Sequence, residues 1–246
     1  MDRAVQILRF LAENGDAVSL TEIAEATGIP ASSAHRILSS LQAHCFVIQD
    51  GRRHRLGFGL VPLAQSALKN LADHGDATPY LTEITGRWNE VSSVCALVEN
   101  RVVCLQVSSI VNEPHRTQFF VRPGQIMPFN GAASGKVILA YQDLDRIETV
   151  ISENQFTSYT TTTITDAEAF RQHLTMIREQ GYALCEEELE IGVSALAVPI
   201  KNVSGEVISC LAVVAPTARL QAHLENGMLN SLRSTGHRMS LCSIAN

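Results

Sequence analysis

Basic side chains are concentrated in one short stretch of a chain that is acidic as a whole. The 246-residue sequence has a formal net charge of -6. The stretch spanning residues 30–57 nevertheless holds a single acid, Asp50, beside four arginines, Arg36, Arg52, Arg53 and Arg55. Guanidinium groups bind the phosphate oxygens of nucleic acids, and only the local field matters there because salt screens charges beyond about 8–10 Å. The chemistry that this stretch suggests is contact with DNA.

Two short helices are predicted to position the first part of this stretch. Ser19 with Glu22 three residues later is a capping box, which predicts a helix that ends at Gly28. A second helix, polar at its start, begins around residues 31–33, and two helices joined in this way form the helix-turn-helix pattern. Arg36 is expected to contact phosphate or the minor groove. The side chains expected near base edges are Ser32, Ser33, His35 and Ser39.

A β-hairpin is predicted directly after the second helix. Asp50-Gly51 is a typical two-residue hairpin turn between alternating apolar and polar positions. A hairpin in this place is a wing, and Arg52, Arg53 and Arg55 are expected to meet the DNA backbone or the minor groove. A basic hairpin alone is more often a solvated edge, but both features in this order favour DNA binding.

The chain is expected to divide into two domains joined by a helix. Apolar residues at helical spacing over 60–71 predict that helix, and the Gly/Pro-containing segment 73–79 follows it. Residues 1–72 carry seven Lys/Arg and six Asp/Glu, whereas residues 73–246 carry twelve and nineteen. We therefore expect a winged helix-turn-helix domain over 1–58, a linker helix over 59–76, and a binding and oligomerisation domain over 77–246.

The second domain has an α+β pattern. Strands are expected over 91–99, 101–109, 117–121, 182–187, 193–200 and 206–214. Helices are expected over 131–141, after a capping box formed by Thr165 and Glu168, and from Arg219 onward. Strand pairs with helices between them predict a largely antiparallel sheet with helices packed on it.

No catalytic motif is present, and the chain is not expected to be an enzyme or to need a cofactor. The segment GAASGKV (131–137) has three residues between its glycines where a Walker A loop has four, and Val137 follows the lysine. The glutamates at 186–188 would suit a metal or a general base, although a solvated strand end is the commoner role for such a run. The six cysteines form no C-x-x-C pair and are expected to be buried thiols, with no metal site. No apolar run spans a membrane and no secretory signal is recognisable, so a cytoplasmic location is expected.

Several stretches resemble the IclR family of bacterial transcription regulators. They are DRAVQILRFLAENG, SLTEIAEATGIPASSAHRILSSL, RLGFGLVPLA, RPGQIMPFNGAASGKVILA, TSYTTTTITDAEAF and REQGYALCEEELEIGVSALAVPI, and they cover almost the whole chain. The resemblance implies a winged helix-turn-helix, a linker helix and a GAF-like effector domain. It also implies a homodimer or dimer of dimers on roughly palindromic operator DNA.

The resemblance also implies where an effector binds. Ala133 and Ser134 match positions whose backbone N–H groups hold a carboxylate. Cys185 or its neighbour Glu187 matches a position that is often acidic. Positions that carry a cysteine or serines in binders of small acids are Ala195, Ala212 and Val214 here. This loss of polar groups predicts a bulkier, more apolar effector, such as an aromatic or branched acid, entering past Met127 and Phe129 beside Asn130.

Two other functions remain open at this stage. The second domain could be a small-molecule enzyme or sensor with a vestigial head, or the winged head could bind protein. The sequence leaves undecided the effector, the operator, the sign of regulation, the choice between dimer and tetramer, and whether Ala212 and Val214 line a pocket or only the core.

Overall fold

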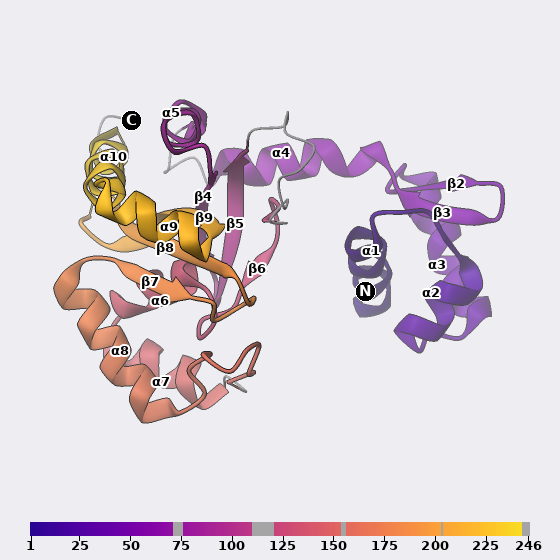
Figure 1. Ribbon diagram of the computed structural model, residues 1–246. Helices are drawn as coiled ribbons and strands as arrows, with labels where there is room; N and C mark the ends of the chain where they lie inside the picture. Colours follow the sequence, from indigo (N-terminus) through magenta and orange to yellow (C-terminus); the bar gives the residue numbers. More distant parts are fainter. Residues whose placement is uncertain (71–75, 110–120, 154–155, 203, 243–246) are drawn as a thin grey trace. The chain divides into compact units, whose positions relative to one another are not determined.

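The computed structural model describes residues 1–70, 76–109, 121–153, 156–202 and 204–242. They form two compact units, Met1–Leu71 and Ala72–Asn246 (Figure 1). Both units combine helices with antiparallel strands, which confirms the α+β fold class. No described helix is both long enough and apolar enough to cross a membrane.

The first unit packs its helices on a small sheet. Its elements are α1 (Asp2–Asn14), β1 (Val18–Ser19), α2 (Leu20–Thr27), α3 (Ala31–Ala43), β2 (Val47–Asp50), β3 (Arg53–Leu56), the 3-10 helix η1 (Phe58–Leu60) and α4 (Val61–Asn70). Strand β3 lies between β1 and β2 and is antiparallel to both. Ile7, Ile23 and Leu38, one from each of the first helices, are at most 1 % exposed and meet in one core. This is the winged helix-turn-helix that the sequence predicts.

The predicted capping box sets the start of α2. Ser19 Oγ accepts a hydrogen bond from the backbone N–H of Glu22 at 3.3 Å, and the Ser19 N–H donates to Glu22 Oε2 at 2.6 Å. Hydrogen bonding of the Ser19 backbone N–H, and then of the Ser19 side chain, to the Glu22 carboxyl lowers the pKa of that carboxyl. Gly28 ends the helix with φ 66°, a left-handed conformation that is unfavourable for residues with a Cβ atom.

Replacing Ser19 by alanine is expected to destabilise α2 by about 1 kcal/mol, because the Glu22 N–H then loses its acceptor. Hydrogen–deuterium exchange of peptides covering α2 in the intact chain measures this loss. Ser40→Ala, an exposed change on α3, serves as the control. Equal exchange in α2 for wild type and Ser19→Ala would contradict the role of the cap.

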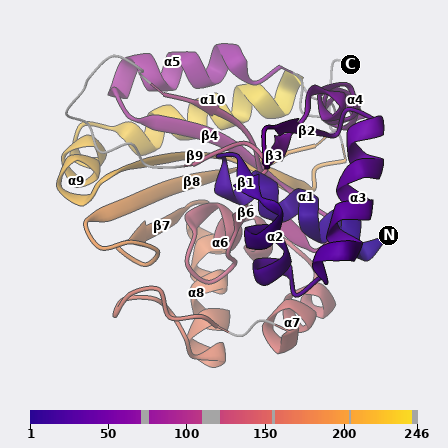
Figure 2. The same ribbon diagram turned by 90° about the vertical axis from the view of Figure 1, so that its right-hand side faces the viewer.

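The second unit is built around one six-stranded antiparallel sheet. Its strands are β4 (Val91–Val98), β5 (Arg101–Ser108), β6 (Ile126–Met127), β7 (Ala183–Glu186), β8 (Val193–Lys201) and β9 (Val207–Pro216), in the order β6-β5-β4-β9-β8-β7. Helices α5 (Thr78–Trp88), α9 (Thr217–Glu225) and α10 (Met228–Cys242) cover one face (Figure 2). Helices α6 (Ala133–Ala140), α7 (Leu144–Glu153) and α8 (Ala167–Gln180) cover the other.

Alternation along the central strands supplies both cores. On β9, Cys210 and Ala212 belong to the core under α6, whereas Leu211 and Val213 belong to the core under α5 and α10. All four side chains are at most 4 % exposed. Period-two alternation therefore lets a single strand hold the two helical layers together.

Several boundaries differ from the predictions. The helix cap expected at Thr165 is wrong, because Asp166 is the N-cap and its Oδ1 accepts from the Ala169 N–H at 2.8 Å. Both residue types cap helices well, and spacing alone does not choose between them. The helical tail is two helices separated by a turn at Gly227. Helices α5 and α7 have no counterpart among the predictions, and residues 117–120 of the strand expected over 117–121 lie outside the described residues.

Candidate DNA-binding surface and ligand cavity

The outer face of α3 presents the polar side chains that the sequence assigns to DNA. Ala34, Leu38 and Leu41 occupy the buried face of this helix. On the remaining surface, Ser33 is half-buried, and the exposed residues are Ser32, His35, Arg36 and Ser39. Ser39 Oγ donates to the carbonyl of His35 at 2.9 Å, so its hydroxyl keeps only its acceptor function for a ligand.

The wing displays its arginines outward, with one difference from the prediction. The two-residue turn is Gly51-Arg52, because Asp50 still belongs to β2 and pairs with Arg53. Arg53 Nη1 donates to the Ala17 carbonyl at 2.5 Å, which ties the wing to the residue before β1. Arg52 and Arg55 are exposed and form no ion pair within the described chain. They are therefore the wing cations best placed to meet a phosphate.

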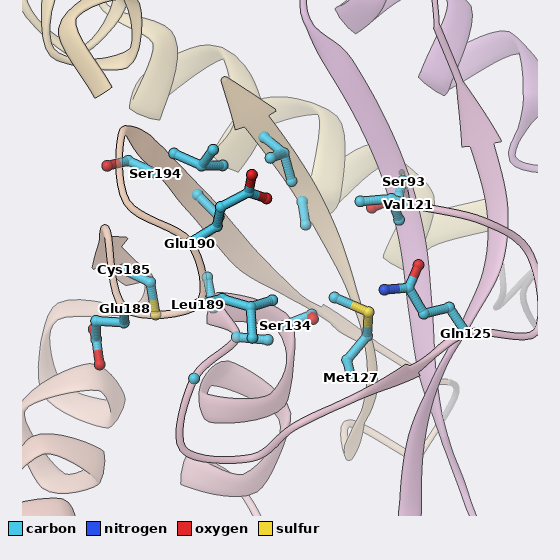
Figure 3. A pocket seen from close by; sticks show the side chains of 17 residues that line it. Ser93, Val121, Gln125, Met127, Ser134, Cys185, Glu188, Leu189, Glu190 and Ser194 are labelled. Carbon is cyan, nitrogen blue, oxygen red and sulfur yellow. The ribbon is translucent and has the colours of Figure 1, made fainter. Parts of the chain in front are cut away.

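One cavity of the second unit, of about 160 Å³, opens over the sheet beside α6 (Figure 3). Its floor follows the strand register: Ser93 lies opposite Ala212, and Cys185 and Val214 lie on either side of Ala195. These five residues all line the cavity. Burial raises the pKa of the Cys185 thiol, so this side chain acts as a small apolar wall.

The N-terminus of α6 forms a second wall. Ala132 precedes the helix and provides no side-chain cap, while Ala133 and Ser134 open it and line the cavity. The first N–H groups of a helix have no acceptor within it and attract anions. Pro128 lies so near that a Cβ at Gly135 would stand 2.4 Å from its carbonyl oxygen. This close packing fixes the position of the helix start.

A buried ion pair forms the third wall. Lys136 on α6 is fully buried, and its Nζ lies 2.5 Å from Oε2 of Glu188, which lines the cavity. Glu190 lines the cavity as well and is exposed. Because Glu188 is bound to Lys136, it is not free for a metal or base role of the run at 186–188. The described residues contain no group of three His, Cys, Asp or Glu side chains suited to a metal ion.

Threonine side chains hold the loop that carries Glu188. Thr160 Oγ1 donates to the Glu187 carbonyl at 2.7 Å, and Thr163 Oγ1 donates to the Glu188 carbonyl at 2.6 Å. Asn130 fastens the threonine segment in turn, because its Nδ2 donates to the carbonyls of Thr157 and Ile164 at 3.0 and 3.1 Å. The cavity wall is thus positioned by a network of side chain to backbone bonds.

The structure brings most of the predicted effector residues to this cavity. Those that line it are Met127, Ala133, Ser134, Cys185, Ala195, Ala212 and Val214. Phe129, Asn130 and Glu187 do not line it. Phe129 packs against the core, Asn130 is 1 % exposed and positions the threonine segment, and Glu187 occupies a left-handed turn with φ 57°.

Sequence reasoning did not identify several residues of the cavity. Among them are Ser93, Gln125, Glu188, Glu190 and Ser194. Ser93 lies opposite Ala212 across β4 and β9, strands that are more than one hundred residues apart in the chain. Alternation along β4 shows which residues share a face with Ser93 within that strand. Only the strand order shows that Ala212 of β9 lies on the same face of the sheet.

Comparisons with known proteins match both units. The model of the IclR helix-turn-helix domain matches residues 1–51, and that of the bacterial transcriptional regulator IclR C-terminal domain matches residues 65–241. The HTH-type transcriptional regulator XynR of Escherichia coli is 29 % identical, over 92 % of this chain and 90 % of that protein. An IclR transcriptional regulator from Alicyclobacillus acidocaldarius is similar in structure, with a TM-score of 0.85, 29 % identity and coverage of 98 % of this chain and 97 % of that one.

A further solved structure was determined with a ligand. It is an IclR homologue from Microbacterium hydrocarbonoxydans in complex with 4-hydroxybenzoate, with a TM-score of 0.83, 25 % identity and coverage of 99 % of this chain and 98 % of that one. The family models together span nearly the full length of the chain, and its folds are those of the matched regulators. The chain belongs to the IclR family of bacterial transcriptional regulators and carries its helix-turn-helix DNA-binding domain.

Proposed function

We propose that this regulator binds DNA through α3 and the wing and changes that binding when a small, largely apolar organic acid occupies the cavity beside α6. The observation that carries the proposal is the cavity itself, in which an uncapped helix N-terminus faces walls of Ala, Val and Met side chains. The helix start suits a carboxylate, and the walls suit an aromatic or branched hydrocarbon.

The size and polarity of the walls argue against very small keto acids. Ala195, Ala212 and Val214 donate no hydrogen bonds from their side chains, and each missing bond costs a polar ligand about 0.5–1.5 kcal/mol. The relative crystallised with 4-hydroxybenzoate supports an aromatic acid. Isothermal titration calorimetry with 4-hydroxybenzoate, benzoate, glyoxylate and pyruvate tests the proposal, and tight binding of glyoxylate or pyruvate would overturn the effector class.

The proposed DNA contact gives a prediction for the wing. Arg55→Ala is expected to weaken binding to DNA of any sequence and to lower the slope of log K against log salt by about one, because one phosphate contact is lost. Fluorescence anisotropy over a salt series measures the slope. Arg9→Ala, an exposed change on α1, is the matched control and should leave the slope unchanged. If Arg55→Ala keeps the wild-type slope, this arginine does not contact phosphate.

The proposed mechanism is a population shift in an oligomer. Phe58, Val61 and Leu63 are 73 %, 45 % and 56 % exposed around the start of α4, and exposed apolar side chains this close in the sequence support contact with a second copy of the chain. We propose a homodimer or a dimer of dimers acting on operator DNA in the cytoplasm. The oligomer would exist in two arrangements that bind DNA differently. The effector shifts the equilibrium between them only by as much as its own affinities for the two arrangements differ.

A further inference from the structure

The first unit contains a groove between the start of α2, the exposed side of α3 and the wing. Its volume is about 320 Å³. The first turn of α2 contributes Leu20 and Thr21, α3 contributes His35 and Ser39, and the wing contributes Arg52 and His54. The groove thus lies beside the residues expected to contact DNA, although Thr21 and His54 are not among those residues.

The α2 side of the groove presents backbone donors. Ser19 and Glu22 satisfy each other in the capping box, so the N–H groups of Leu20 and Thr21 are the first-turn donors left without an acceptor in the helix. Arg52 adds a full positive charge from the wing. Backbone N–H groups and a guanidinium are a donor set that suits a phosphate oxygen.

His54 gives independent support for an anionic ligand. The side chain is 6 % exposed, and its Nδ1 is buried without a hydrogen-bond partner. The ring also bonds to the backbone of Val18, in a manner that favours its protonated form. A buried polar atom without a partner is costly, and the residue lines the groove, so a negative charge entering the groove would favour the protonated ring.

We propose that this groove seats one phosphate of the DNA backbone and that His54 takes up a proton when the phosphate enters. The inference rests on the proposed DNA-binding function and adds a regulatory property to it: DNA affinity depends on pH. A neutral ring gives a phosphodiester anion no charge to attract it, whereas a protonated ring adds a second positive charge to the groove beside Arg52.

The charged surroundings of His54 set the direction of the pH effect. His35 acts on it from α3, Arg53 and Arg55 flank it in β3, and Arg52 lines the same groove. The acids of these elements are Glu22 on α2, which is engaged with Ser19 and Arg53, and Asp50, which pairs with Arg53 across the hairpin. Burial lowers the pKa of His54 and His35 lowers it further, so the free domain holds this ring neutral at pH 7. A bound phosphate favours the protonated ring and so raises the pKa of His54. Because DNA binding then takes up a proton, the affinity for DNA must increase as pH falls.

The test measures binding of the full-length protein to a mixed-sequence duplex from pH 6 to pH 8 at constant low salt. The wild type is expected to gain at least about threefold in affinity from pH 8 to pH 6. His54→Gln keeps a polar side chain that can donate a hydrogen bond but cannot titrate, and it is expected to lose most of this gain. His44→Gln, an exposed change at the end of α3, is the control and should keep it. Far-UV circular dichroism checks that each variant is folded.

A second readout uses the wild type alone. The NMR signal of the His54 ring, assigned through the His54→Gln variant, should titrate at higher pH in the DNA complex than in the free protein. An unchanged His54 titration, or a His54→Gln variant with the wild-type pH dependence, would overturn the inference and leave DNA binding intact. A complete lack of DNA binding at low salt would instead overturn the proposed function.

Discussion

Replacing Lys136 by methionine is expected to lower the free energy of unfolding of the second unit by about 3–5 kcal/mol. Lys136 is fully buried and Glu188 is 8 % exposed, so the variant leaves a carboxylate in the interior without its partner. The Glu188 carboxylate then either stays charged without a partner or takes up a proton, and both states cost free energy. Urea denaturation of wild type and variant measures the loss.

Two companion variants separate charge pairing from packing. Lys201→Met removes an exposed lysine from β8 and should cost less than about 1 kcal/mol. The double variant Lys136→Met with Glu188→Leu removes both charges and should recover much of the loss. If Lys136→Met is no less stable than Lys201→Met, the buried ion pair does not hold the cavity wall.

A nearby histidine reports on the same charge. Burial and the positive charge of Lys136 lower the pKa of His173 to about 4, so this ring is neutral at neutral pH. The fold therefore loses stability as the pH falls from about 6.5 toward 4, where the unfolded chain binds this proton more readily. Removing the lysine charge should raise the pKa of His173 while burial continues to lower it. An NMR titration of the ring therefore shows whether the Lys136 charge was lost without a wider rearrangement.

Filling the cavity is expected to abolish the response to the acid. Ala195 lies in the middle of the floor, half-buried and between Cys185 and Val214 on the neighbouring strands. Leucine at this position occupies part of a space of only about 160 Å³. Binding of an aromatic acid should weaken at least about tenfold, which corresponds to 1.4 kcal/mol. Calorimetry with 4-hydroxybenzoate measures the change.

The matched control is the same substitution away from the cavity. Ala218 is exposed on α9 and does not line the cavity, so Ala218→Leu should leave affinity for the acid unchanged. An overpacked core substitution typically costs about 1–3 kcal/mol. The leucine of Ala195→Leu enters existing space, so the free energy of unfolding of this variant should fall by less than that. An acid that binds Ala195→Leu as tightly as wild type would place the effector elsewhere.

Local patterns account for the parts of the fold that the sequence predicts well. The Ser19 and Glu22 capping box, the wing after α3 and the pairing of residues 91–98 with 101–108 depend on neighbours within a few residues. The sequence predicts helix α6 within 131–141, but its burial on every side resists such reasoning, because the helix has no polar stripe. Strand order resists it too, since β4 pairs with β9 across most of the second unit.

The candidate site likewise contains residues that could be predicted and residues whose roles depend on distant contacts. Ala133, Ala195 and Ala212 were reached through resemblance to the family, and they do line the cavity. The structural roles of Lys136 and Asn130 could not be predicted, because a lysine and an asparagine in a loop–helix segment are normally solvent-exposed. Their burial follows from partners on distant segments, Glu188 for Lys136 and the carbonyls of Thr157 and Ile164 for Asn130.

The most direct test of the central claim is fluorescence anisotropy of the full-length protein on duplexes tiling the DNA upstream of its own gene, with and without 4-hydroxybenzoate or benzoate. We predict a sequence-specific complex whose affinity changes with one of these acids for the wild type and for Ala218→Leu, but not for Ala195→Leu. An acid that calorimetry shows to bind, yet that leaves the affinity for every specific duplex unchanged, would contradict a ligand-responsive regulator.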